Sequence, residues 1–155
     1  MTEREAVAQA MAFFEASDDI VLLHQALAEV APRARRMVSQ FMGRGGEEAI
    51  PPPADLRPAR QLASKADAMR TLKGASDFSL LQVLARSVGR RIEAIEIAAS
   101  AEFPEGVHVV VPAQPTFPPS GAQLSGIVES TGTVLRVLLD NGETWNGPPS
   151  LARLA

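Results

Sequence analysis

The pattern of apolar and polar positions divides the chain into a helical part and a C-terminal part rich in strands. Up to about residue 100, apolar residues recur every three or four positions, as they do on one face of a helix. Further along, β-branched and aliphatic runs of strand length occupy 107–111, 124–130 and 133–140. The sequence therefore predicts an α+β protein in which the helices come first and a small antiparallel sheet comes last.

Short turns separate the predicted strands. A turn at 130–132 divides the second strand from the third, and Asn141-Gly142 follows the third. Asn-Gly is the strongest short hairpin signal, because both residues tolerate the positive φ that a type I′ turn requires. We expect the chain to reverse there into a fourth strand that begins at Thr144, with a last short strand at 151–154.

One face of the predicted third strand is too apolar for open water. Alternation places positions 135, 137 and 139 on one face and positions 134, 136 and 138 on the other. Because Val134 and Leu138 belong to the second face, we expect a loop, a helix or a partner to cover it. Trp145 and Phe117 join them as candidate protein-binding residues, although a structural role inside the barrel is favoured for Trp145.

The first helices are predicted from their caps. Thr2 and Glu5 form a capping box, and the helix that they open runs to about Ala16. Ser17-Asp18-Asp19 is a second start signal, since a cap and acids suit the positive end of a helix dipole. Pro32 interrupts the helical hydrogen-bond ladder but fits the first turn of a new helix, so we expect a break there.

A glycine- and proline-rich segment follows these helices. Its three consecutive prolines, 51–53, favour an extended, semi-rigid chain. Apolar periodicity resumes at about Pro58 with a helix that ends near Gly74, and Ser76 or Ser79 opens a last helix that continues to about Ser100. The predicted regions are a helical hairpin region at 1–42, a Gly/Pro linker at 43–58, a helical region at 59–103 and the strand-rich region at 104–155.

Composition and charge change this picture in two ways. The 155 residues include no cysteine, which excludes disulfides, thiol catalysis and thiolate metal sites. No apolar run has the roughly 18 residues of a membrane span, and the N-terminus does not resemble a signal peptide, so we expect a cytoplasmic protein without a membrane partner. The composition is typical of a bacterial source.

The net charge is −3, yet residues 57–91 carry eight basic and two acidic side chains, which either pair with the acidic N-terminal segment or face a polyanion.

The sequence contains little that indicates catalysis. His24 and His108 are the two histidines, and neither has an acidic cluster nearby. Asp18-Asp19 is explained by a helix start, and Gly43-Arg-Gly-Gly lacks the Gly-Lys-Ser/Thr ending of a phosphate-binding loop. We therefore expect no enzyme, no metal and no cofactor. A site made from both histidines would require them to converge in space.

The last predicted helix contains the segment Leu84-Ala-Arg-Ser-Val-Gly89, with Ile95 six residues further on. This segment resembles the Leu-Ala-x-x-aliphatic-Gly…Ile pattern of helix-turn-helix DNA-binding domains. In that family the glycine lies at the turn and the next helix enters the major groove. The resemblance implies nucleic-acid binding by Arg86, Arg90 and Arg91. The alternative is one continuous helix through Gly89, since the apolar stripe continues past it.

The chain order of residues 106–154 resembles that of SH3-like barrels, including the Tudor-like and ribosomal types. The order comprises a first strand, the long proline-rich loop 112–121, two hairpin-linked strands, a fourth strand and a last short strand. Gly126-Ile-Val and Leu139-Asp-Asn-Gly-Glu are similar to segments of the second and third strands of such barrels. The resemblance implies a small barrel that binds peptides, other proteins or RNA.

These observations support three hypotheses of different classes. The leading one is a non-enzymatic adaptor that docks on a protein partner, or on a second copy of itself, through the C-terminal barrel. The second is a nucleic-acid-binding regulator that uses the basic middle of the chain. The third, a small enzyme or metal protein, has the least support.

Overall fold

The computed structural model describes residues 1–155 as two compact units. The first unit is Met1–Arg91 and the second is Ile92–Ala155, so the boundary falls inside a helix, α4. Both flanks of the predicted Gly/Pro linker belong to the first unit. None of the helices is long and apolar enough to cross a membrane.

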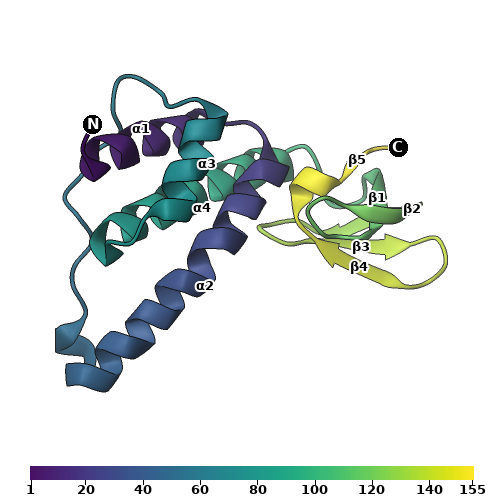
Figure 1. The fold of residues 1–155 in the computed structure, drawn as a ribbon. Coiled ribbons are helices and arrows are strands. Elements are labelled where there is room, and N and C mark those ends of the chain that lie inside the picture. Colours follow the sequence, from purple (N-terminus) through teal and green to yellow (C-terminus); the bar gives the residue numbers. More distant parts are fainter. The chain divides into compact units, whose positions relative to one another are not determined.

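Helices come first and a five-stranded antiparallel sheet comes last, which confirms the predicted α+β class (Figure 1). The helices are α1 (Glu3–Ala16), α2 (Ile20–Gly45), α3 (Lys65–Gly74) and α4 (Phe78–Ser100), with a short 3-10 helix at Gly46–Ala49. α3 packs against both α1 and α2.

Local side-chain caps fix the starts of all four α-helices. The Thr2 hydroxyl accepts from the Glu5 N–H at 3.1 Å, and the Asp19 carboxylate accepts from the Leu22 N–H at 3.1 Å, at the two starts that the sequence predicts. At α4, the Asp77 carboxylate accepts a backbone N–H at 3.0 Å. α4 therefore begins at Phe78, after a cap that lies between the two predicted ones, Ser76 and Ser79.

The break predicted at Pro32 was wrong, because α2 continues through this residue. A proline removes one backbone donor from the ladder, and this cost is offset where tertiary contacts hold both sides of the helix. After Pro32, Arg33 Nη1 donates to the Leu72 carbonyl oxygen at 2.8 Å, and the Phe41 ring meets the Phe78 ring edge-on at 5.2 Å.

The helix predicted from Pro58 begins later, at Lys65, where the Ser64 hydroxyl caps it. The preceding segment is extended and bonds to the helices beside it. The Ala59 N–H donates to the Ala8 carbonyl oxygen of α1 at 2.9 Å. Because these backbone groups find partners outside their own segment, no helix is needed to satisfy them.

The core of the first unit is formed by the apolar faces of the helices. Its fully buried large side chains come from α1, α2, α3 and α4: Val7, Phe14, Leu23, Val30, Leu72, Leu81, Leu84 and Val88. These positions follow the three- and four-residue spacing in the sequence, which is the reason that periodicity located the helices.

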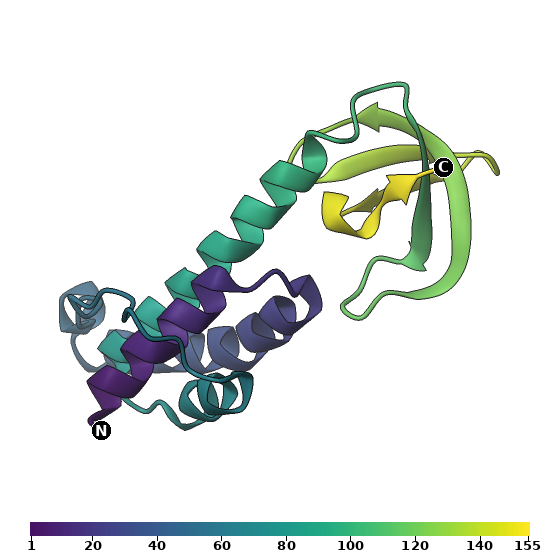
Figure 2. The ribbon, with the colours of Figure 1, turned by 90° about the horizontal axis from the view of Figure 1, so that it is seen from above.

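The sheet has the strand order β4-β3-β2-β1-β5, and all neighbouring strands are antiparallel. The strands are β1 (His108–Gln114), β2 (Ser120–Ser130), β3 (Leu135–Leu139), β4 (Thr144–Gly147) and β5 (Arg153–Leu154), with a 3-10 helix at Pro149–Leu151. β2 is the longest strand and bends along its length (Figure 2).

The predicted β3–β4 hairpin forms, but its turn is not type I′. Gly142 has a φ of 88°, whereas Asn141 has a negative φ. The Gly142 N–H donates to the Leu139 carbonyl oxygen at 2.9 Å, and the Asn141 side chain accepts from the Glu143 N–H at 2.9 Å. One left-handed glycine after a tight turn therefore reverses the chain.

A second core lies on one side of the sheet. Its buried members are Phe103, Val109, Val111, Val128, Leu135, Val137, Leu139 and Trp145. Glu96, in the part of α4 that belongs to the second unit, is 7% exposed. Its carboxylate accepts from the Ser150 N–H at 2.7 Å and from the Ser150 hydroxyl at 2.8 Å, which satisfies both oxygens of this buried side chain.

Candidate partner-binding face

Two exposed apolar side chains lie on the face of the sheet opposite to its core, and a third lies in the bend that leads into β3. Ile127 of β2 and Leu138 of β3 are direct cross-strand partners, and their exposed fractions are 39% and 43%. Val134, just before β3, is 57% exposed. We call Ile127, Val134 and Leu138 the candidate face.

A row of exposed residues crosses the sheet at the centre of the candidate face. His108 of β1 pairs with Ile127, and Leu138 pairs in turn with Thr144 of β4. Directly opposed side chains on neighbouring strands touch one another. Ile127 and Leu138 therefore form one continuous apolar surface with two polar ends, His108 and Thr144.

An ion pair lies beside this row. Arg136 Nε and Glu129 Oε2 are 3.0 Å apart on neighbouring strands. Both side chains are largely exposed, so the pair contributes little to stability. Val134 precedes β3 by one residue, in the bend that leads into the strand. The ion pair thus borders the apolar residues of the candidate face.

Close packing of β2 on β3 sets the register that exposes these residues. A Cβ atom at Gly126 would lie 2.4 Å from the Leu138 carbonyl oxygen and 2.7 Å from Val137 Cγ1, so only glycine fits at this position. Gly126 pairs with Leu139, which is buried. Because side chains alternate across a strand, this pairing turns Ile127 and Leu138 away from the core.

The structure divides the four predicted protein-binding residues into two groups. Val134 and Leu138 are exposed, as a contact surface requires. Trp145 is 4% exposed, pairs with Val137 on the core side and donates its indole N–H to the Pro112 carbonyl oxygen at 2.8 Å. From that position Trp145 contacts the sheet's own core, which corrects its assignment as a contact residue.

Phe117 is half-buried in the loop between β1 and β2. Ile127, in contrast, is part of the candidate face although sequence reasoning did not select it. The alternation of 124–130 contains the needed signal, since Ile127 has the opposite parity to the buried Val128. The β2–β3 register was also needed, because only that register places Ile127 opposite Leu138.

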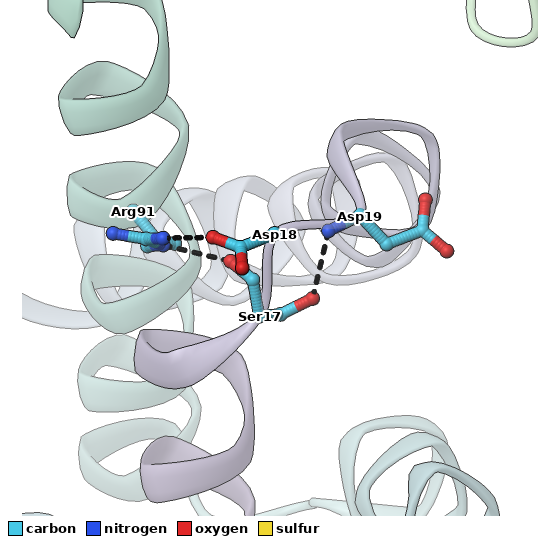
Figure 3. A network of polar contacts seen from close by, with 4 residues as sticks. All are labelled: Ser17, Asp18, Asp19 and Arg91. Carbon is cyan, nitrogen blue, oxygen red and sulfur yellow. Dashed lines mark hydrogen bonds and ion pairs between the residues drawn. The ribbon is translucent and has the colours of Figure 1, made fainter.

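The three arginines predicted to contact nucleic acid have different surroundings. Arg86 and Arg90 are exposed and take part in no ion pair. Arg91 is engaged within its own unit, where Nε donates to the Ser17 carbonyl oxygen at 2.7 Å and Nη2 meets the Asp18 carboxylate (Figure 3). This is the pairing with the acidic N-terminal segment that the charge distribution left open.

α4 is helical through Gly89, so it has no turn at the position where the helix-turn-helix resemblance requires one. A Cβ atom at Gly89 would meet nothing within 4 Å, and the glycine is not needed for close packing either. Among the remaining candidate residues, His24 lies in α2 and His108 in β1. No group of three or more His, Asp or Glu side chains is arranged to hold a metal ion.

Comparisons with protein-family models, with curated proteins and with solved structures find no match for this chain. Its function is therefore argued from its own geometry.

Proposed function

We propose that this chain is a non-enzymatic binding or adaptor protein, and that the candidate face docks on an apolar surface of a protein partner or of a second copy of the chain. The observation that carries the proposal is the pair Ile127 and Leu138, directly opposed and exposed at the centre of a sheet face. Large apolar side chains that neighbour one another on a surface mark interaction sites more often than scattered ones do. The proposal includes a bacterial, cytoplasmic location, as expected from the sequence.

Strand order supports the further proposal that the second unit is an SH3-like module. β1 pairs with both β2 and β5, and a 3-10 helix, Pro149–Leu151, precedes β5. The order of the strands agrees with the resemblance, but the expected long loop 112–121 is shorter, because β1 and β2 extend into it and leave only 115–119 between them. Modules of this class use surface loops and sheet faces for binding, so the proposed class agrees with the proposed function.

The exposed fractions set the energetic scale of docking. Fully burying a large aliphatic side chain contributes about 1.5–3 kcal/mol, and each of the three is roughly half exposed. Complete burial of the candidate face would thus contribute roughly 3 kcal/mol. A micromolar complex needs about 8 kcal/mol. The three residues would form the centre of a larger contact, with the Arg136–Glu129 pair at its rim.

The test is Leu138→Asp, with Val134→Asp as a second variant. A charge on the candidate face should abolish association and leave folding intact, because both side chains are exposed. Leu62→Asp is the matched control, since Leu62 is 51% exposed and lies in the first unit. Thermal unfolding of each variant checks that the fold persists.

Sedimentation velocity over a range of concentrations measures self-association. Quantitative capture of partners by immobilised protein, compared between the variants, measures association with other proteins. The proposal predicts that at least one of these signals is present in wild type and Leu62→Asp and lost in Leu138→Asp. Equal association of all the variants would contradict it, and so would a wild-type protein that stays monomeric and captures nothing.

The exposed and unpaired Arg86 and Arg90 favour nucleic-acid binding as a second candidate function. Fluorescence anisotropy of labelled duplex DNA and single-stranded RNA, from about 50 to 200 mM salt, measures it. Binding that weakens steeply with salt and falls in Arg86→Ala/Arg90→Ala would support it. Salt-independent binding, or none at low salt, would argue against it.

A further inference from the structure

A small cavity with a charged rim lies in the first unit, between α4, α1 and the extended segment 54–56. Its volume is about 120 Å³. Its lining residues are Met11, Ala54, Asp55, Leu56, Val83, Arg86, Ser87 and Arg90. All of them belong to the same compact unit.

Burial divides this lining into a floor and a rim. Met11, Val83 and Ser87 are buried, at 5%, 6% and 2% exposure. Arg86 and Arg90 are exposed. The three buried side chains close the cavity from below, whereas most of the surface that lines it is polar, as a site for a charged group requires. The Ser87 hydroxyl adds a polar group to the floor.

The rim has an excess of positive charge. Arg86 and Arg90 are four residues apart on one helix, so their guanidinium groups extend from the same face one turn apart. Neither takes part in an ion pair. Asp55 is the one acidic residue of the lining, and Arg4 Nη2 donates to its carbonyl oxygen at 3.0 Å. The lining therefore carries two guanidinium groups and one carboxylate, and Arg4 holds the Asp55 backbone from outside it.

We propose that this cavity, here called the arginine pocket, binds a phosphate group. Guanidinium groups form paired N–H···O bonds with phosphate oxygens, and two of them one turn apart can hold different oxygens of one tetrahedral anion. The cavity volume is several times the roughly 30 Å³ that one water occupies in the liquid. It has room for the phosphate group alone, so the rest of a phosphorylated molecule would extend into solvent.

The proposal does not depend on the candidate face, which belongs to the other unit. The nucleic-acid candidate would use the same contacts, because the phosphodiesters of a nucleic acid and free phosphate monoesters both present a phosphate group. The experiment therefore has one arm for each source.

Inorganic phosphate is titrated into the full-length protein while backbone amide resonances are followed by NMR. We expect saturable shifts at Arg86, Ser87 and Arg90. Arg86→Ala and Arg90→Ala should each weaken binding roughly tenfold or more, because each removes a charge-assisted hydrogen bond. Arg90→Lys should also weaken binding, since a lysine keeps the charge but not the planar fork.

Arg35→Ala is the matched control. Arg35 is an exposed arginine of α2 in the same unit, and it lines no part of the cavity. Its removal lowers the net charge by the same amount and should leave phosphate binding unchanged. Equal weakening in Arg35→Ala and Arg90→Ala would overturn the proposal, because the loss of phosphate binding would then follow from the lower net charge and not from the arginine pocket. Absence of saturable shifts in the wild type would overturn it as well.

The two sources are separated by competition. A nucleoside monophosphate and a single-stranded oligonucleotide without terminal phosphates are each added to the phosphate-loaded protein. Displacement by the monophosphate alone supports a pocket for free phosphorylated molecules, and displacement by the oligonucleotide supports contact with a nucleic-acid backbone. Oligonucleotide binding that survives Arg86→Ala/Arg90→Ala and does not displace phosphate would mean that the oligonucleotide binds elsewhere on the chain. This result would contradict nucleic-acid binding by Arg86 and Arg90 but not phosphate binding by the arginine pocket.

Discussion

Glu96 provides the sharpest test of what holds the second unit together. This residue is 7% exposed, and its carboxylate accepts two hydrogen bonds from Ser150, at 2.7 and 2.8 Å. A hydrogen bond to a charged group contributes about 1.5–3 kcal/mol. Replacing Glu96 by alanine removes both bonds, and the half-buried Ser150 recovers part of the loss by binding water. We expect Glu96→Ala to lower the free energy of unfolding by about 3 kcal/mol.

Glu96→Gln separates the hydrogen bonds from the charge. An amide has the same shape, and it can still accept from the Ser150 N–H and donate to the Ser150 hydroxyl. The expected loss is about 1 kcal/mol, the difference between charged and neutral hydrogen bonds. Glu93, one turn earlier and exposed, is the matched control, and Glu93→Ala should cost less than about 0.5 kcal/mol.

Urea denaturation followed by tryptophan fluorescence measures these differences. Trp145 is the single tryptophan of the chain and lies in the core of the second unit, so its signal reports that unit. With a slope of about 1–1.5 kcal/mol per molar urea, Glu96→Ala should lower the midpoint by about 2 M. A midpoint no lower than that of Glu93→Ala would refute the reasoning, since it would mean that the two bonds contribute nothing net.

Two further predictions concern backbone packing and the Arg91 contacts. Gly126→Ala should destabilise the sheet by about 2–3 kcal/mol, because the new methyl group would lie 2.4 Å from the Leu138 carbonyl oxygen; the same urea assay measures it. Arg91→Ala should cost about 1–1.5 kcal/mol, mainly through its bond to the Ser17 carbonyl oxygen, whereas Asp18→Ala should cost less than about 0.5 kcal/mol, since Asp18 is 90% exposed. Circular dichroism of the helices during thermal unfolding compares these two variants.

Each prediction has an outcome that contradicts it. Gly132→Ala is the control for Gly126→Ala, because a methyl group at Gly132 would come no closer than 3.9 Å to its neighbours. Equal stability of the two glycine variants would contradict the argument from close strand packing. A loss in Asp18→Ala as large as that in Arg91→Ala would show that the exposed ion pair, rather than the carbonyl contact, holds Arg91.

The location of most elements could be predicted from sequence because the signals are local. A side-chain cap satisfies backbone donors three residues away, so the Thr2 start was found and the second start was located to Ser17-Asp18-Asp19, where Asp19 rather than Ser17 is the cap. Strand alternation likewise predicted which side chains of β3 are buried. Successive side chains of a strand point to opposite faces, and this does not depend on the neighbouring strands. Val134 and Leu138 were identified as exposed candidates by this rule.

Errors arose where other contacts outweighed a local preference. Pro32 disfavours a continuous helix, yet contacts of Arg33 and Phe41 with other helices hold α2 together. Asn141 favours a type I′ turn, but the hairpin closes with a left-handed Gly142 alone. The continuity of α2 is not encoded within a window of a few residues, whereas the turn is closed by local hydrogen bonds of Gly142 and Glu143, which compete with the type I′ geometry.

The sequence by itself determined which segments are helices and strands, which of their faces are apolar, and that the bases gather in the middle of the chain. Only the tertiary structure decided what those faces meet. Strand register placed Ile127 beside Leu138 and turned Trp145 inward, and helix packing engaged Arg91 while leaving Arg86 and Arg90 at a cavity rim. The physical reason is that propensity and periodicity act within a few residues, whereas a binding surface is made by contacts between residues far apart in the chain.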